Sequence, residues 1–130
     1  MTEIRQHVPL YVDASLVSGR GVYCAENLRA GQLIEVAPVI RLPAKDLERI
    51  HATTLHDYYF IWGKNDEQVG IVLGYGSLYN HDSSPTAEYV PDFEHDVLTF
   101  YALKAIPANT EITVNYNGTP SVVKKLWFEQ

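Results

Sequence analysis

The sequence has little cysteine, few basic residues and no long apolar run. Cys24 is the only cysteine among 130 residues, so an internal disulfide and a cysteine-rich zinc site are excluded. We expect Cys24 to be a small buried hydrophobic residue. No apolar stretch approaches the roughly 18 residues of a membrane-spanning helix. Residues 1–6 lack the apolar segment of a secretory signal, so we expect an intracellular protein, cytoplasmic if its source is bacterial.

Basic residues are outnumbered, with 10 Lys and Arg against 16 Asp and Glu, which gives a net charge of −6. An acidic surface disfavours phosphate backbones and favours a cationic partner. The only basic doublet is Lys124-Lys125, too little for a nucleic-acid interface. We therefore expect no direct contact with nucleic acid or membrane. The length predicts one domain, over residues 1–130.

Glycine-rich and metal-binding patterns are also weak. Gly19-Arg20-Gly21 is not followed by a third glycine and a helix, so it is no dinucleotide fingerprint, and taken alone it indicates a hairpin turn. His51 and His56 are five residues apart and do not share a helical face. The acidic residues at 92–96 are typical of a solvated turn. We expect no metal site.

Short apolar segments separated by turn residues dominate the chain and predict a mostly β protein. Apolar residues also recur at three- and four-residue steps after Pro43, which predicts one helix of three to four turns through Leu47, Ile50, Thr54, Leu55 and Tyr58. The expected strands span residues 8–15, 22–25, 33–40, 59–62, 69–73, 87–90, 97–103 and 111–116.

Tyrosine is the most frequent aromatic residue, with nine copies against four Phe and two Trp. Most of these tyrosines are expected to be amphipathic core residues. A few fit the wall of a narrow channel, because aromatic faces attract cations and hydroxyls orient amines. Asn80-His81, in a loop bounded by Pro85, carries many hydrogen-bonding atoms that a folded chain must satisfy.

Four segments occur in the order found in one known family. They are Gly19-Arg20-Gly21-Val22-Tyr23, Asp57-Tyr58-Tyr59-Phe60, Asn80-His81 with Pro85, and Glu111-Ile112-Thr113-Val114-Asn115-Tyr116. Over about residues 9–128 the chain resembles the SET domain of protein-lysine methyltransferases. In length and layout it resembles the small stand-alone SET proteins of bacteria and of a large algal virus.

The resemblance implies the SET-domain, or β-clip, fold. This fold has several small curved sheets, one short helix and a C-terminal segment that passes beneath the Asn-His loop in a knot-like threading. The family implies S-adenosylmethionine (SAM) on one face, a lysine-containing protein or peptide on the other, and a narrow channel between them. The implied reaction is methyl transfer to the lysine amine, for which neither a metal nor a covalent enzyme intermediate is needed.

Site residues are carried over from the matching motifs. The cofactor residues implied are Gly19, Arg20, Gly21, Asn80, His81 and Trp127. Tyr116 is implied at the methyl-transfer point, and Tyr58 and Tyr89 as walls of the lysine channel.

Some positions depart from the family pattern. Asp82 follows the Asn-His pair where Ser or Cys is common, and Thr86 stands where Asn usually follows the proline. Val114 stands where Phe or Tyr often sets the number of methyl groups added, so that number is left open, as is the choice between monomer and homodimer. A catalytically inactive SET-fold module that binds peptides remains the alternative.

Overall fold

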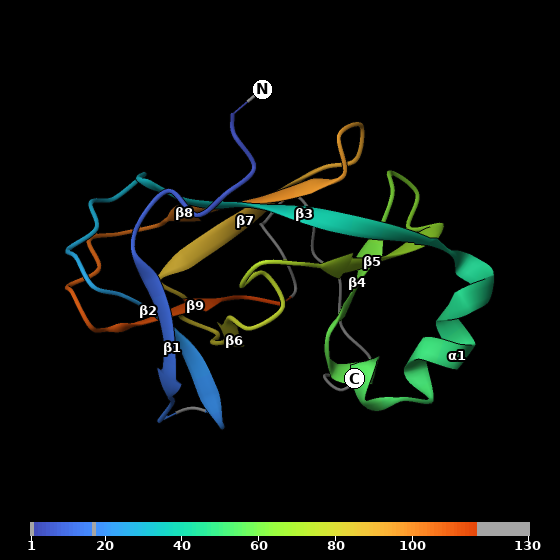
Figure 1. The fold of residues 1–130 in the computed structure, drawn as a ribbon, viewed down its shortest axis with the longest axis horizontal. Helices are drawn as coiled ribbons and strands as arrows, with labels where there is room; N and C mark the ends of the chain where they lie inside the picture. The colour runs from blue at the N-terminus through green and yellow to red at the C-terminus, as the bar shows by residue number, and fades with distance from the viewer. Residues whose placement is uncertain (1, 17, 117–130) are drawn as a thin grey trace.

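The computed structural model describes residues 2–16 and 18–116, which are built mainly from short strands (Figure 1). The mostly β fold expected from the sequence is confirmed, although the two-residue strand β6 was not predicted. The strands are β1 (Leu10–Ala14), β2 (Arg20–Cys24), β3 (Leu33–Pro43), β4 (Tyr59–Trp62), β5 (Gln68–Val72), β6 (Asn80–His81), β7 (Ala87–Asp92), β8 (Val97–Ala102) and β9 (Glu111–Val114).

One sheet brings three of the sequence motifs together. Its strand order is β1-β2-β9-β6. β1 and β2 form an antiparallel hairpin, and β9 pairs antiparallel with β2 but parallel with β6. The parallel pair sets Asn80 opposite Thr113 and His81 opposite Val114. The C-terminal segment therefore runs beside the Asn-His pair as far as it is described; the rest of the expected threading lies outside the described residues.

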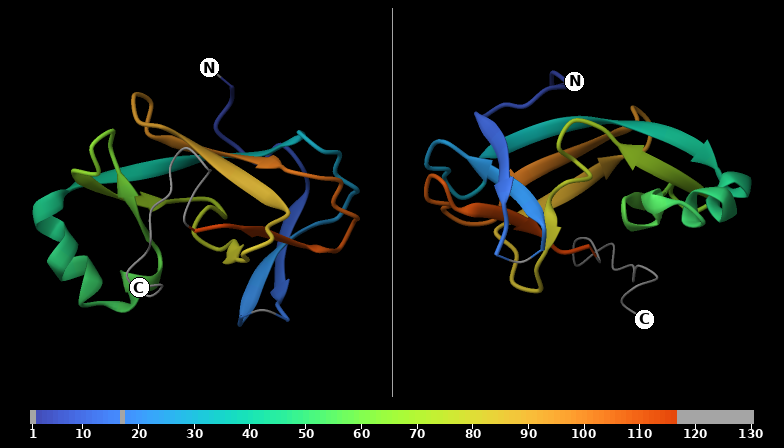
Figure 2. Two further views of the ribbon diagram at one scale, coloured as in Figure 1. Left: turned by 180° about the vertical axis from the view of Figure 1, so that it is seen from behind. Right: turned by 60° about the horizontal axis from the view of Figure 1, so that its bottom comes forward.

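The second sheet has the strand order β4-β5-β3-β8-β7. The long strand β3 joins the two halves of this sheet. Its residues 33–38 pair with β8, and its residues 39–43 pair with β5. The β1–β2 hairpin and α1 lie at opposite ends of the molecule, and β3 runs between them (Figures 1 and 2). A register shift between Leu33 and Glu35 interrupts the pairing of β3 with β8.

The core combines side chains from both sheets. Val22 and Ile112 from the first sheet and Ile34 and Phe100 from the second are all fully buried and belong to one cluster. Cys24 belongs to it as well and is 1% exposed. The prediction that Cys24 is a small buried hydrophobic residue is confirmed.

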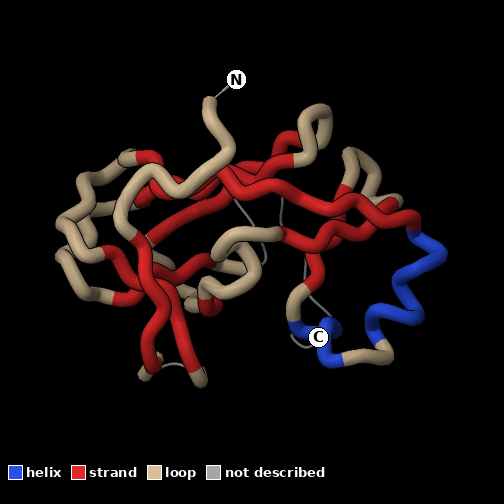
Figure 3. Tube along the Cα trace, in the orientation of Figure 1, coloured by secondary structure: helices blue, strands red, loops and turns tan. Residues whose placement is uncertain are grey.

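The predicted helix of three to four turns is wrong. The segment instead forms a 3-10 turn at Ala44–Asp46, the five-residue helix α1 (Leu47–His51) and a second 3-10 turn at Thr54–Asp57 (Figure 3). Thr53 is extended and its hydroxyl accepts the N–H of Leu55, so the helix ends and a new turn begins. These three segments contain no buried residue. Packing against the core therefore does not stabilise a single long helix with its apolar residues on one face. Among the described residues, no helix is long and apolar enough to cross a bilayer.

Candidate active site

Asn80 connects the turn of the β1–β2 hairpin to the C-terminal strand. Its side-chain nitrogen lies 3.2 Å from the carbonyl oxygen of Ser18 and 3.0 Å from that of Arg20. The same nitrogen lies 2.7 Å from Glu111 Oε2 and 3.1 Å from Ser15 Oγ. These four oxygens hold Asn80 in place and gather hydrogen-bond acceptors beside the glycine-containing turn.

Gly21 allows close packing of the Glu111 and Asn80 side chains against the backbone. A Cβ atom there would lie 2.3 Å from Glu111 Oε2 and 3.0 Å from Asn80 Nδ2. Glu111 also accepts a hydrogen bond of 2.6 Å from the hydroxyl of Ser15. Glu111 was quoted within a motif but not predicted as a site residue, although its place at the start of that motif was the available signal.

Gly19 and Arg20 lie at the turn that joins the two strands of the hairpin. Gly19 has a φ of +50°, a left-handed conformation that favours glycine, and no atom lies within 4 Å of a Cβ placed there. Arg20 begins β2 and is exposed. Because the turn joins two antiparallel strands, the hairpin predicted from the sequence is present.

His81 and Tyr116 are brought together by the parallel pairing of β6 and β9. The backbone N–H of Tyr116 donates a hydrogen bond of 2.9 Å to His81 Nδ1. Their ring centroids are 5.2 Å apart. This contact fixes the start of the segment after β9 against the Asn-His pair.

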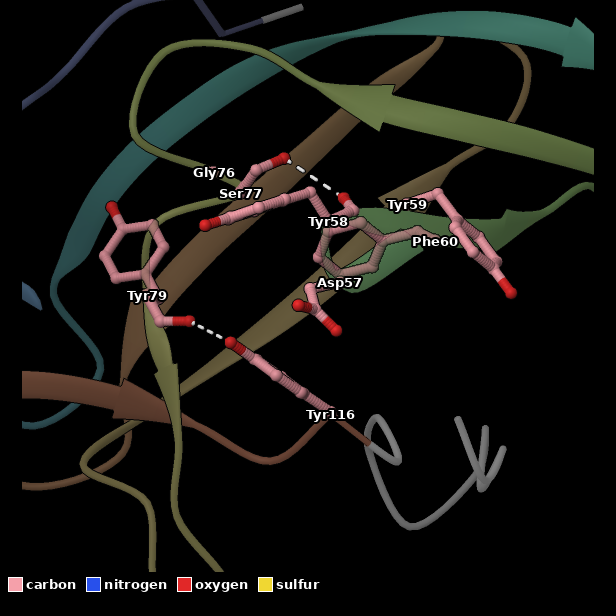
Figure 4. Close-up of a pocket in the computed structure, with 8 residues that line it drawn as sticks. All are labelled: Asp57, Tyr58, Tyr59, Phe60, Gly76, Ser77, Tyr79 and Tyr116. Atoms are coloured by element: carbon pink, nitrogen blue, oxygen red, sulfur yellow. Dashed lines mark hydrogen bonds between the residues drawn. The ribbon is translucent and has the colours of Figure 1, made fainter. Parts of the chain in front are cut away.

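A narrow pocket opens beside the phenol of Tyr116 (Figure 4). The Tyr116 hydroxyl donates a hydrogen bond of 2.7 Å to the backbone carbonyl of Tyr79. Tyr58 and Tyr116 were predicted to meet at a channel, and both line this pocket. The lining residues are Asp57, Tyr58, Tyr59, Phe60, Gly76, Ser77, Tyr79 and Tyr116.

Tyr89 lies behind this wall and is not among the pocket's lining residues. Its ring packs edge-on against Phe60, with 5.7 Å between centroids. Its hydroxyl donates a hydrogen bond of 3.0 Å to the backbone carbonyl of Tyr116. Tyr89 therefore supports two pocket residues from behind.

Tyr79 and Phe60 are pocket residues that the sequence did not single out. Tyr79 is 1% exposed, and its ring stacks on Phe100 with 4.4 Å between centroids. Tyr79 was one of many tyrosines beside predicted strands, and only its position immediately before Asn80 set it apart. Phe60 stood in a quoted motif next to Tyr58 but was assigned no role.

The weaker patterns of the sequence form no metal site in the part of the chain that the structure describes. The rings of His51 and His56 are near each other, with centroids 5.9 Å apart. At the tip of the β7–β8 hairpin, His95 Nδ1 lies 2.7 Å from Asp92 Oδ2. This hydrogen bond lowers the pKa of Asp92 and raises the pKa of His95, as expected of a solvated ion pair on a turn.

Thr86, which departs from the family pattern, connects the loop after Asn80 to β9. Thr86 exchanges hydrogen bonds with Thr113, its hydroxyl accepting the Thr113 N–H at 3.0 Å and its own N–H lying 3.2 Å from Thr113 Oγ1. The threonine that replaces the usual asparagine thus ties the loop to β9. Trp127, predicted to cover the cofactor, lies outside the described residues.

The comparisons with known proteins agree with this geometry. A SET-domain family model matches residues 19–117. The histone-lysine N-methyltransferase of Schizosaccharomyces pombe specific for H3 lysine-37 is 31% identical over 123 residues, which cover 93% of this chain and 78% of that protein.

Solved structures show the same fold. A Plasmodium falciparum protein assigned as a histone methyltransferase superposes with a TM-score of 0.68 at 29% identity, over 85% of this chain and 94% of that chain. The Neurospora histone lysine methyltransferase DIM-5 gives a TM-score of 0.68 at 21% identity, over 93% of this chain and 56% of that chain. The chain therefore belongs to the SET-domain family.

Proposed function

We propose that the protein transfers methyl groups from SAM to a substrate lysine held in the pocket beside Tyr116. Its SET domain and its histone-lysine methyltransferase relative make it a protein-lysine methyltransferase, so the proposal concerns the residues and the substrate. The observation that supports it most is the double role of Tyr116. Its backbone N–H contacts His81, from the cofactor motif, and its phenol lies in the pocket wall.

The residues at the hairpin turn fit SAM. The carbonyl oxygens of Ser18 and Arg20, together with the Glu111 carboxylate, are acceptors suited to an amino-acid ammonium group. The exposed Arg20 guanidinium suits a carboxylate. Gly21 leaves out the Cβ that would crowd this region.

We assign Gly19, Arg20, Gly21, Asn80 and His81 to cofactor binding. Trp127 remains a proposed cover for the adenine. When bound, SAM supplies an electrophilic methyl group on a positively charged sulfur.

The pocket prepares the lysine to act as a nucleophile. A lysine amine has a reference pKa of about 10.4 and is almost fully protonated at neutral pH. Asp57 lies at the pocket wall, with a half-exposed carboxylate whose Oδ1 is 3.2 Å from His56 Nε2, and its negative charge attracts the ammonium form. The aromatic rings of Tyr58 and Phe60 line the same pocket and shield the amine from water, which favours loss of its proton.

Alignment is the second contribution of the pocket. Its walls restrict the amine to one approach, and orientation of this kind lowers the barrier to transfer. The Tyr116 phenol, held by the Tyr79 carbonyl, presents its oxygen to the reacting groups. Tyr89 acts through Tyr116 and Phe60 as a positioning residue.

The substrate class proposed is a Lys- and Arg-rich protein segment, histone-like or of another protein. The net charge of −6 favours such a segment. The relative from Schizosaccharomyces pombe is named for histone H3. Monomer and homodimer both remain compatible with this proposal.

Incubation of a lysate with purified protein and methyl-labelled SAM, followed by mass spectrometry of modified lysines, tests the proposal. We expect label on a small set of lysines with basic neighbours, and none with Tyr116→Phe. If wild-type protein binds SAM but labels no lysine, the protein is the inactive peptide-binding module instead.

A further inference from the structure

A buried carboxyl group lies next to the pocket. Glu35 is 2% exposed and lies in the central strand β3. Residues 34–37 of this strand are all buried, so both of its faces are covered there, and the Glu35 side chain lies inside the protein. The Tyr79 hydroxyl donates to Glu35 Oε1 at 2.6 Å, and the Tyr75 N–H donates to Oε2 at 3.0 Å.

Burying this group is costly for the fold. A carboxylate removed from water loses solvation that two hydrogen bonds replace only in part. Burial raises the pKa of Glu35, while the hydrogen bond from Tyr79 acts in the opposite direction. Burial, and after it the charge of Glu35, raises the pKa of Tyr79, so that phenol keeps its proton and donates it. An apolar side chain in place of Glu35 would leave the Tyr79 hydroxyl and the Tyr75 N–H without their acceptor, so the carboxyl group and these two donors form one unit.

One oxygen of Glu35 is connected to the Tyr116 phenol through Tyr79. The Tyr79 ring is fixed at its hydroxyl by Glu35 and on its face by Phe100. The backbone carbonyl of the same residue accepts the Tyr116 hydroxyl at 2.7 Å. The position of Tyr79 therefore sets the position of the Tyr116 oxygen.

The other oxygen of Glu35 contacts the turn that forms another part of the pocket wall. It holds the N–H of Tyr75 at the turn that continues into Gly76 and Ser77, which line the pocket. Gly74 begins this turn with a φ of +62°, and a Cβ there would lie 2.3 Å from Glu35 Oε2. The turn therefore packs closely against the carboxyl group.

We propose that Glu35 is a positioning residue for methyl transfer, acting through Tyr79 on the Tyr116 phenol and through Tyr75 on the pocket wall. The proposal rests on the methyl-transfer role of Tyr116 proposed above. It assigns no contact with substrate or cofactor to Glu35.

The test compares Tyr79→Phe and Glu35→Gln with a control, Trp62→Phe. Trp62 is as buried as Tyr79, and its indole N–H donates to Asp96 at 3.0 Å, with neither residue in the pocket lining. We expect kcat to fall on the order of tenfold to 100-fold in Tyr79→Phe, as small misplacements of reacting groups do. The Kd for SAM and the KM for peptide should stay near wild type.

The control should lose thermal stability but keep kcat. Glu35→Gln, which retains an acceptor for Tyr79, should keep more activity than Glu35→Met, which retains the shape alone. If Tyr79→Phe and Glu35→Met lower the melting temperature but leave kcat unchanged, the proposal is wrong. An inactive wild type would instead contradict the proposed function.

A readout without turnover completes the test. With 3-fluorotyrosine incorporated, the fluorine resonance of Tyr116, assigned by its loss in Tyr116→Phe, should shift in Glu35→Met and in Tyr79→Phe. It should not move in Trp62→Phe. A resonance that is unchanged in the first two variants overturns the proposal, whatever the activity of the wild type.

Discussion

The phenol of Tyr116 donates a hydrogen bond of 2.7 Å to the backbone carbonyl of Tyr79, the residue immediately before the Asn-His pair. The backbone N–H of Tyr116 meanwhile donates to His81. Tyr116 is thus hydrogen-bonded through both its backbone and its side chain to residues 79–81. These contacts connect the predicted cofactor residues to the pocket.

Removing the Asn80 side chain is expected to weaken SAM binding and destabilise the fold. Asn80→Ala leaves the Arg20 carbonyl and Glu111 without this donor. We expect the binding free energy of SAM to weaken by about 1–3 kcal/mol. Calorimetric titration with SAM and urea unfolding measure the two effects. Asn65→Ala, on an exposed turn, is the control. A loss of stability with an unchanged SAM Kd would remove Asn80 from the cofactor site.

Two glycine substitutions separate crowding from backbone strain. Gly21→Ala forces the Glu111 carboxylate away, so we expect a weaker SAM affinity. Gly19→Ala has open space but a φ of +50°, so we expect a stability loss of about 1–2 kcal/mol and near-normal binding. The same titration and unfolding measurements apply. Weaker SAM binding by Gly19→Ala than by Gly21→Ala would contradict this account.

Glu35 is expected to make stability depend on pH. Burial raises its pKa in the folded state above the ordinary 4.5, so the folded state holds the proton more tightly than the unfolded chain. Its contribution to stability is complete below the unfolded pKa and is lost as pH rises through the folded pKa. Urea unfolding from about pH 4 to pH 7 should show wild type losing stability relative to Glu35→Gln. A constant difference would mean that Glu35 does not titrate in this range.

Cys24 is expected to be unreactive in the native protein. It is 1% exposed, and burial raises the pKa of its thiol, which lowers the fraction of reactive thiolate. A chromogenic disulfide reagent should label it slowly in buffer and rapidly in denaturant. Rapid labelling in buffer would show that the strand pairing around β2 opens readily.

The sequence predicts well what depends on local pattern and poorly what depends on distant contacts. Tyr58 and Tyr116 stood in ordered motifs, and both line one pocket, while their roles at a lysine channel stay predictions. Glu35 gave no signal, because its burial depends on the covering of both faces of β3 and on hydrogen-bond partners some 40 residues away. The helix was overestimated because spacing alone does not reveal that Thr53 ends it.

The measurement that tests the central claim most directly is the rate of methyl transfer by Tyr116→Phe to the lysine mapped with wild type. We predict a loss on the order of 100-fold or more in kcat, typical of removing one hydrogen-bonding group from a preorganised site, because the variant lacks the phenol oxygen positioned by the Tyr79 carbonyl. The SAM Kd should be unchanged. Transfer at the wild-type rate would contradict the role of this phenol.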